Sequence, residues 1–179
     1  MPDATSRRGG GSAVATRRPV PGIVVRRATA RDLAAIVELR LALLRGERRN
    51  PFFAEPHPDA ARRAARLTYA ECAAPDQVLL VAMRDHDVVG MLRCRAVRRT
   101  PLVANARQAV VSTVYVLPSE RRSGVLRALL GAADRWCRRH RLSGMRLQCA
   151  LANDVGRRAW ESLGFRPAEL LYLRAVPPA

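Results

Sequence analysis

Lysine is absent from this 179-residue chain, although the chain carries 32 basic residues and a formal net charge of +17. Every basic residue is therefore arginine. A chain selected for contact with phosphates would have no reason to exclude lysine, which serves well as a point charge for that purpose. The arginine bias instead indicates a GC-rich genome, and we expect most of these side chains to face water. The charge still implies some affinity for polyanions.

Aromatic residues are scarce and long apolar runs are missing. Aromatics make up 4% of the chain against 49% hydrophobic residues, so the core must be built mainly from alanine, valine and leucine. No apolar run approaches the ~20 residues of a membrane span. Arg7 and Arg8 are not followed by the apolar stretch of a secretory signal. We therefore expect a cytoplasmic protein without a membrane partner.

Metal-binding and disulfide patterns are also missing. The chain has no C-x-x-C pair, and its cysteines and histidines are widely spaced. Such spacing suits neither a zinc site nor a small disulfide framework, so we predict no metal. The residues concerned are Cys72, Cys94, Cys137, Cys149, His57, His86 and His140.

The pattern of the remaining residues predicts a basic tail followed by a single domain. Residues 1–22 contain glycines, prolines and arginine pairs without periodicity, which predicts a flexible tail. Residues 23–179 are long enough to bury a core. Helical periodicity predicts helices over about 29–45, 59–73 and 124–141, and one after Asn153. Strand-like runs lie at 23–26, 78–83, 88–96, 109–116, 145–150 and 165–176.

Two local details of these helices follow from the pattern of residues. Thr29 and Asp32 have the spacing of a capping box at the start of the first helix. The second helix is predicted to pack through one apolar side, which carries Ala60, Ala64, Leu67 and Ala70. Three of the strands follow one another without a helix between them. This order predicts an α/β fold of the α+β type, with a mixed, mostly antiparallel central sheet and helices on both faces.

The most informative segment is residues 114–127, where a buried-type strand leads through a tight polar turn into a long helix. The first backbone N–H groups of a helix lack partners and lie at the positive end of its dipole. Preceded by a loop of small residues, they form a cradle for a phosphate or pyrophosphate. Gly124 allows close approach, while Arg121, Arg122 and Arg127 add charged donors.

This segment resembles the signature of the GNAT superfamily of N-acetyltransferases. The superfamily pattern is Gln or Arg, two variable residues, Gly, one variable residue, then Gly or Ala, and residues 121–126 read RRSGVL. Only Leu126 departs from it. Residues 153–165 resemble the C-terminal segment of the family, which runs from an Asn to Tyr-Glu-x-x-Gly-Phe. The resemblance covers roughly residues 23–176.

The resemblance implies that acetyl-coenzyme A donates an acetyl group and that a neutral amine attacks its thioester directly. The strand at residues 114–116 would pair with the pantetheine arm and supply a backbone N–H for the developing oxyanion. In the family the matching Asn also binds this arm. The predicted coenzyme-binding residues are Val114, Tyr115, Val116, Arg121, Arg122, Ser123, Gly124, Val125, Leu126, Arg127 and Asn153.

No catalytic residue can be named from the sequence. The family often has a carboxylate on the central strand, but residues 109–116 contain none. The frequent general-acid tyrosine aligns with Trp160, whose indole N–H is not acidic. A water chain or a group from the loops at 46–57 or 97–107 is the expected base. Asn153 has a plainer reading as a helix N-cap, and Gly164 as the glycine that ends that helix.

Three functions remain open at this point. The first is an N-acetyltransferase acting on a small-molecule or peptide amine, alone or as a homodimer. The second is a GNAT-fold protein that binds acyl-coenzyme A without catalysis, which the residues at positions 126 and 160 permit. The third is a basic nucleic-acid-binding module, which the charge permits but the shortage of aromatic stacking residues disfavours. Specific binding of nucleic acid is therefore not expected.

Overall fold

The computed structural model describes residues 20–53, 55–98, 100, 102 and 107–174. Most of the predicted tail lies outside these residues, and its boundary with the domain stays a prediction. The chain forms a five-stranded sheet in the order β1-β2-β3-β4-β5. The strands are β1 (Ile23–Arg27), β2 (Gln77–Arg84), β3 (Asp87–Arg98), β4 (Arg107–Val116) and β5 (Met145–Arg146). The first four pair antiparallel, whereas β5 runs parallel to β4.

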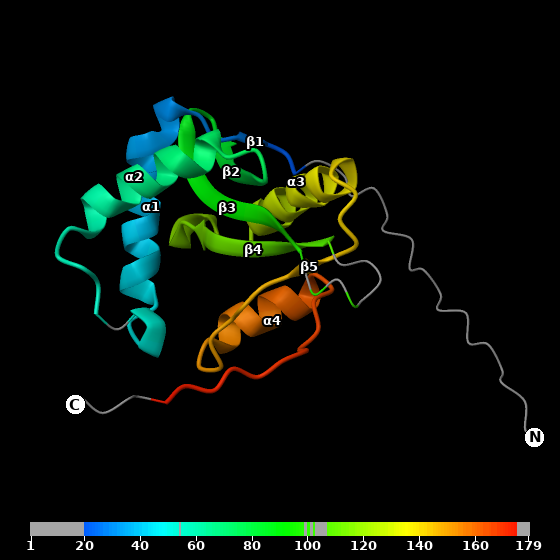
Figure 1. Ribbon diagram of the computed structural model, residues 1–179. Coiled ribbons are helices and arrows are strands. Elements are labelled where there is room, and N and C mark those ends of the chain that lie inside the picture. Colours follow the sequence, from blue (N-terminus) through cyan, green and yellow to red (C-terminus); the bar gives the residue numbers. More distant parts are fainter. Residues whose placement is uncertain (1–19, 54, 99, 101, 103–106, 175–179) are drawn as a thin grey trace, which may run out of the picture.

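Helices cover both faces of this sheet (Figure 1). They are α1 (Leu33–Gly46), α2 (Ala60–Ala73), α3 (Val125–Arg139) and α4 (Asp154–Ser162), with short 3-10 turns η1 (Ala30–Asp32), η2 (Pro51–Phe53) and η3 (Pro118–Glu120). Alternating sheet residues face opposite layers: Leu80 and Leu92 pack with α3, whereas Leu79 and Met91 pack with α1. The predicted fold class is confirmed.

Two predicted strands are wrong in extent or existence. The strand expected over residues 145–150 ends at Arg146. The β region expected over 165–176 has no strand in its described part, up to residue 174. Leu170, Leu171, Tyr172 and Leu173 are all more than half exposed there. An apolar run shows only that a segment suits a strand, and a strand also needs a hydrogen-bonded neighbour, which these residues lack within the described structure.

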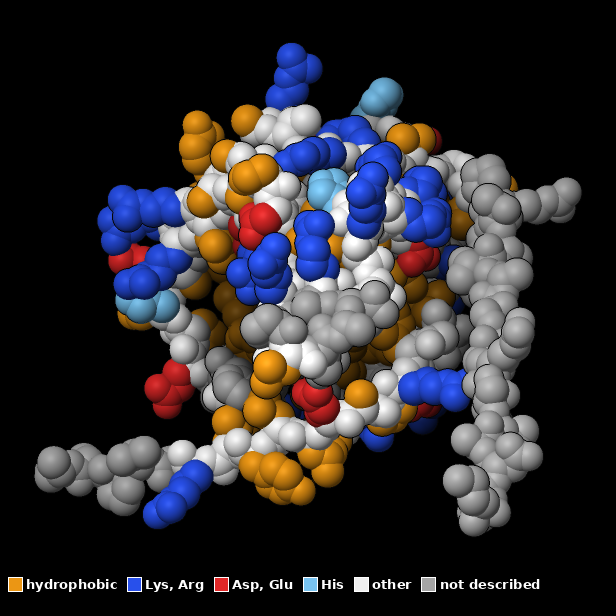
Figure 2. Space-filling model, turned by 45° about the vertical axis from the view of Figure 1, so that its right-hand side comes forward, with side chains coloured by type: hydrophobic (Ala, Val, Ile, Leu, Met, Phe, Trp, Pro, Cys, Tyr) orange, Lys and Arg blue, Asp and Glu red, His pale blue; other side chains and the backbone are white. Residues whose placement is uncertain are grey.

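Arginine accounts for much of the molecular surface, as the composition predicts. Figure 2 shows arginine side chains gathered over one face of the molecule. Along α3, the exposed arginines are Arg127, Arg135, Arg138 and Arg139. Arg40 is the contrasting case, because only 7% of this residue is exposed.

Arg40 belongs to a buried charge cluster that joins both helices of one layer to the sheet. Its guanidinium pairs with the carboxylate of Glu71 on α2, which is 2% exposed. Arg93 on β3 places its Nε 3.2 Å from Glu71 Oε1. The same guanidinium donates to Gln77 Oε1 on β2 at 2.8 and 2.6 Å. One carboxylate thus holds two guanidinium groups between α1, α2 and the sheet.

This cluster corrects the predicted inner face of α2. The buried residues of the helix are Ala64, Thr68 and Glu71, whereas Leu67 is 49% exposed. The apolar pattern of the sequence places Leu67 on the inner side of the helix with Ala60, Ala64 and Ala70. Because Glu71 pairs with Arg40 and Arg93 from distant parts of the chain, α2 turns Glu71 toward the interior and Leu67 toward solvent.

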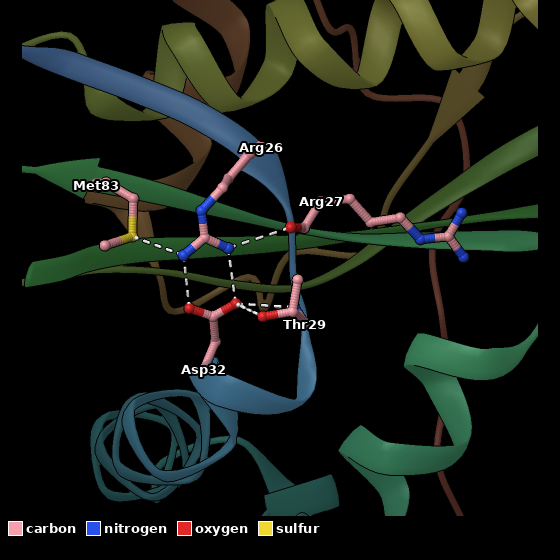
Figure 3. Close-up of polar contacts among 5 residues, drawn as sticks. All are labelled: Arg26, Arg27, Thr29, Asp32 and Met83. Atoms are coloured by element: carbon pink, nitrogen blue, oxygen red, sulfur yellow. Dashed lines mark hydrogen bonds and ion pairs between the residues drawn. The ribbon is translucent and has the colours of Figure 1, made fainter. Parts of the chain in front are cut away.

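The start of α1 is fixed by a second ion pair, shown in Figure 3. Asp32 accepts from the backbone N–H and the hydroxyl of Thr29 at 2.7 and 3.0 Å, so the predicted capping box is confirmed. Both Nη atoms of Arg26 on β1 donate to the carboxylate at 2.7 Å. These bonds from Arg26 lower the pKa of the nearly buried Asp32 from 3.8 to about 2.

We predict that Glu71→Ala destabilises the fold by about 3 kcal/mol or more, because it leaves two guanidinium groups without their carboxylate in the interior. Leu67→Ala, four residues earlier on the same helix, is the control and should cost about 1 kcal/mol or less. Urea unfolding measures both free energies. Equal losses in the two variants would contradict the assigned inner face of α2.

The Arg26–Asp32 pair predicts a pH-dependent stability. Because folding lowers the pKa of Asp32, its contribution is present above pH ~4 and is lost as the pH falls through about 2. Asp32→Asn keeps an acceptor for the cap but removes the charge. It should cost about 1 to 2 kcal/mol at neutral pH, since Arg26 is 40% exposed and solvent screens the pair. Unfolding titrations from pH 6 to 2.5 should show the difference shrinking; a constant difference would rule out the charge as its cause.

Candidate functional site

A β-bulge lies in the middle of β4. Met91 on β3 pairs with Tyr115 and Arg93 pairs with Ser112, so Leu92 faces the two residues between them. One of these is Thr113, whose φ is 51°. A β-branched residue rarely adopts such a left-handed conformation. The extra residue interrupts the ladder and bends the strand, which leaves backbone groups near Val114 outside regular pairing.

Beyond the bulge, one edge of β4 is open. Only Ala109 and Val110 pair with β5, through Met145 and Arg146. From Val111 to Val116 that edge has no strand partner in the described part of the chain. Figure 1 shows β5 beside one end of β4 only, with α4 on the same side. Unpaired N–H and C=O groups of an edge can bind an extended ligand as an added strand.

β4 leads through η3 and a short turn to a helix N-terminus with unpaired donors. Gly124 is the N-cap of α3, with a φ of 90°. The first amide bonded into the helix is that of Ala128, which donates to Gly124 O at 2.9 Å. Within the described structure the N–H groups of Val125, Leu126 and Arg127 have no backbone acceptor. Unpaired amides at a helix N-terminus can hold an anion, and the anion site at this turn stays a prediction.

Gly124 is required by its surroundings as well as by its φ. A Cβ placed on this residue would lie 3.1 Å from both methyl groups of Val20. Val20 itself accepts from the backbone N–H of Ile23 at 3.2 Å, at the start of β1. The chain entering β1 therefore packs against the first turn of α3. This long-range contact has no signal in the local sequence.

Some polar side chains around this turn are hydrogen-bonded within the protein, and others are exposed to solvent. Arg121 donates from Nε to Val116 O at 3.3 Å and lies over the ring of Tyr115 at 5.8 Å. Ser123 donates to Glu120 O at 2.7 Å. Arg122 and Arg127 are exposed, and neither has a partner in the described part of the chain. These two arginines are therefore the side-chain cations available to a bound anion.

Asn153 acts as the N-cap of α4. Its Oδ1 accepts from Gly156 N at 2.9 Å, which is the plainer of the two readings that the sequence allowed. Its Nδ2 donates to Glu47 Oε1 at 3.4 Å. Glu47, at the end of α1, is a residue that the motifs did not identify, although it lies in the loop from which a base was expected. Its position emerges only from this contact between residues far apart in the sequence.

Trp160 on α4 is held by packing. Its indole lies against the core cluster on the α3 side of the sheet and meets Phe165 edge to face, with ring centroids 5.4 Å apart. Gly164, with a φ of 93°, ends the helix. The aromatic pair couples α4 to the segment that follows it.

No three His, Cys, Asp or Glu side chains of the described residues are grouped so that they could hold a metal ion. None of the helices in the described ranges combines the length and apolar character that crossing a bilayer requires.

Comparison with known proteins gives a family and a set of similar folds. The family model described as "Acetyltransferase (GNAT) family" matches residues 42–165. No curated protein matches the chain. A "predicted acetyltransferase" from Clostridium acetobutylicum, solved with acetyl-CoA, is 19% identical with a TM-score of 0.70, over 85% of this chain and 96% of that one.

Two aminoglycoside acetyltransferases have the same fold. The aminoglycoside N-acetyltransferase AAC(6')-Iy in complex with CoA is 21% identical with a TM-score of 0.72, over 86% of this chain and 94% of its own. The aminoglycoside antibiotic 6'-N-acetyltransferase AAC(6')-IG from Acinetobacter haemolyticus is 21% identical with a TM-score of 0.70, over 87% of this chain and 99% of that chain. At such identities the likeness shows a shared fold and nothing of the substrate.

Proposed function

The chain belongs to the acetyltransferase (GNAT) family, and from that membership we propose that it transfers the acetyl group of acetyl-coenzyme A to an amine. The observation that carries the proposal is the continuity of residues 113–127. A bulged strand with an open edge leads straight into a helix N-terminus with unpaired amides. An extended ligand with a phosphate group at one end suits this combination.

Different residues would bind different parts of acetyl-coenzyme A. The amides of Val125, Leu126 and Arg127 would hold the pyrophosphate, with Arg122 and Arg127 adding charge. The open edge at residues 114–116 would pair with the pantetheine arm. An amide freed near the Thr113 bulge is the proposed donor to the thioester oxygen. The side-chain oxygen of Asn153 caps α4 and its Nδ2 donates to Glu47, so a ligand would use the second N–H of that amide group.

The proposed reaction is direct attack of a neutral amine on the thioester carbonyl. A C–N bond forms, the C–S bond breaks and the thiolate of coenzyme A leaves, while the nitrogen loses its proton to water or a base. A thiol of pKa ~8.5 is a fair leaving group without protonation. The reaction therefore does not require an acid at position 160, where the indole of Trp160 has no acidic proton.

A second candidate is a protein of this fold that binds acyl-coenzyme A without turnover. The absence of a carboxylate in β4, together with tryptophan at position 160, favours it. Calorimetric titration with acetyl-coenzyme A at two salt concentrations, combined with detection of released thiol over a broad amine panel, separates the candidates. Binding with thiol release supports the transferase, whereas binding alone supports the second candidate.

We predict that Arg127→Glu weakens acetyl-coenzyme A binding at least tenfold, equivalent to ~1.4 kcal/mol, without destabilising the fold. The change places a negative charge beside the proposed pyrophosphate site, yet a carboxylate in the first turn is favourable for the helix itself. Arg135→Glu makes the same charge change further along α3 and is the control. Equal weakening in both variants would indicate a general effect of net charge and would contradict the site.

We predict that Trp160→Tyr keeps turnover within an order of magnitude of the wild type, or raises it, because the ring is retained and a phenol can protonate the leaving sulfur. Trp160→Ala should instead lose about 2 kcal/mol of stability, since it opens a cavity at a partly buried aromatic pair. Thiol-release kinetics and urea unfolding measure the two effects. A tyrosine variant that folds and binds normally but loses nearly all turnover would mean that the indole itself takes part.

A further inference from the structure

Glu47 lies where the end of α1 meets the start of α4. Its backbone N–H closes α1 by donating to Leu43 O and Leu44 O at 3.0 and 3.2 Å. Its carboxylate receives one amide from each side: Asn153 Nδ2 is 3.4 Å from Oε1, and Asn50 Nδ2 is 3.4 Å from Oε2. The side chain thus contacts a residue 106 positions away in the sequence, Asn153, as well as its near neighbour Asn50.

The charge environment of Glu47 differs from that of the carboxylates that pair with arginine. Those carboxylates are Asp32, Asp59, Glu71, Glu120 and Asp154. Glu47 has no arginine or histidine within ion-pair distance in the described part of the chain, although it is half-buried. Two hydrogen bonds of 3.4 Å are long for charged acceptors, and a carboxylate can accept about four. The carboxylate of Glu47 can therefore accept further hydrogen bonds from a bound cation.

The position of Glu47 relates it to the open edge of β4. α1 packs across β3 and β4, and the chain after β5 returns through Cys149 to Asn153. Burial raises the pKa of Cys149, and the nearby charge of Glu47 raises it further. Figure 1 shows the last turn of α1 and the first turn of α4 on the same side of β4. From this packing we infer that the carboxylate lies on the side of β4 where the edge of the strand is open.

We propose that Glu47 binds the acceptor as a cation, so the acceptor is an amine that carries positive charge at neutral pH. The inference rests on the proposed acetyl transfer and adds the acceptor class and the residue that recognises it. A cationic acceptor is repelled by a chain of net charge +17 except near a carboxylate without an arginine partner. A charged hydrogen bond to a half-buried carboxylate also fixes the orientation of the acceptor. Because an ammonium nitrogen has no lone pair, the nitrogen that attacks the thioester first gives up its proton to water or a base.

The alternative is that Glu47 only braces α1 against α4. Glu47→Gln distinguishes the two roles, because glutamine still accepts from the asparagine amides but carries no charge. Glu38→Gln, which removes an exposed carboxylate from the same helix, is the matched control. The acceptors are cadaverine, spermidine and an aminoglycoside, all cationic at pH 7, together with p-anisidine, an arylamine that is uncharged there.

We expect acetylation of at least one cationic acceptor by the wild type. Glu47→Gln should lower kcat/KM for it at least tenfold, mainly through a higher KM. The dissociation constant for acetyl-coenzyme A, the melting temperature and any turnover of p-anisidine should stay within twofold or a few degrees of the wild type. Glu38→Gln should leave every one of these quantities unchanged.

The other outcomes contradict the proposed function, the acceptor class or the role of Glu47. A wild type that does not bind acetyl-coenzyme A removes the proposed function, and this inference with it. Binding without acetylation of any cationic acceptor, or acetylation of p-anisidine alone, overturns the acceptor class and leaves the coenzyme site standing. If kcat/KM of Glu47→Gln for cationic acceptors stays within twofold of the wild type, Glu47 has only a structural role. The same conclusion follows if coenzyme affinity or p-anisidine turnover falls as much as kcat/KM for the cationic acceptors.

Discussion

The buried carboxylate of Glu71 is the interaction on which the arrangement of this molecule depends. It pairs with the buried Arg40 of α1 and the partly buried Arg93 of β3, and burial of a cation such as Arg40 is costly without such a partner. The cluster sets where α1 crosses the sheet. Because Glu47 lies one residue beyond the end of α1, the same cluster decides which groups border β4.

The donor side of the proposed site needs no such distant support. Strand, bulge, turn and helix N-terminus follow one another within residues 107–127, so a short stretch of chain builds the open edge and the unpaired amides together. The acceptor side is assembled differently. Its proposed residue depends on two helix ends that meet across the fold, which allows the acceptor to change while the donor loop stays the same.

The sequence predicted what depends on neighbouring residues and failed where distant contacts decide. The capping box at Thr29, the turn at Gly124 and the start of α4 at Asn153 all follow from local chemistry. Leu67 was placed inside because the partners of Glu71 are far away in the chain. β-branched residues favour extended backbone, so no local sequence pattern predicts the left-handed conformation of Thr113 at the bulge. The segment 165–174 has strand-like residues, but strand formation depends on a neighbour that the sequence does not specify.

The packing of Val20 against Gly124 has a mechanical consequence. The N-terminal turn of α3 and the residue that precedes β1 are in close contact, which couples their movements. Local opening of the edge strand β1 and rearrangement of the loop before α3 then belong to a single cooperative unit. A ligand that makes this loop more rigid therefore also slows hydrogen exchange at the amides of β1. That strand lies at the opposite edge of the sheet from β5.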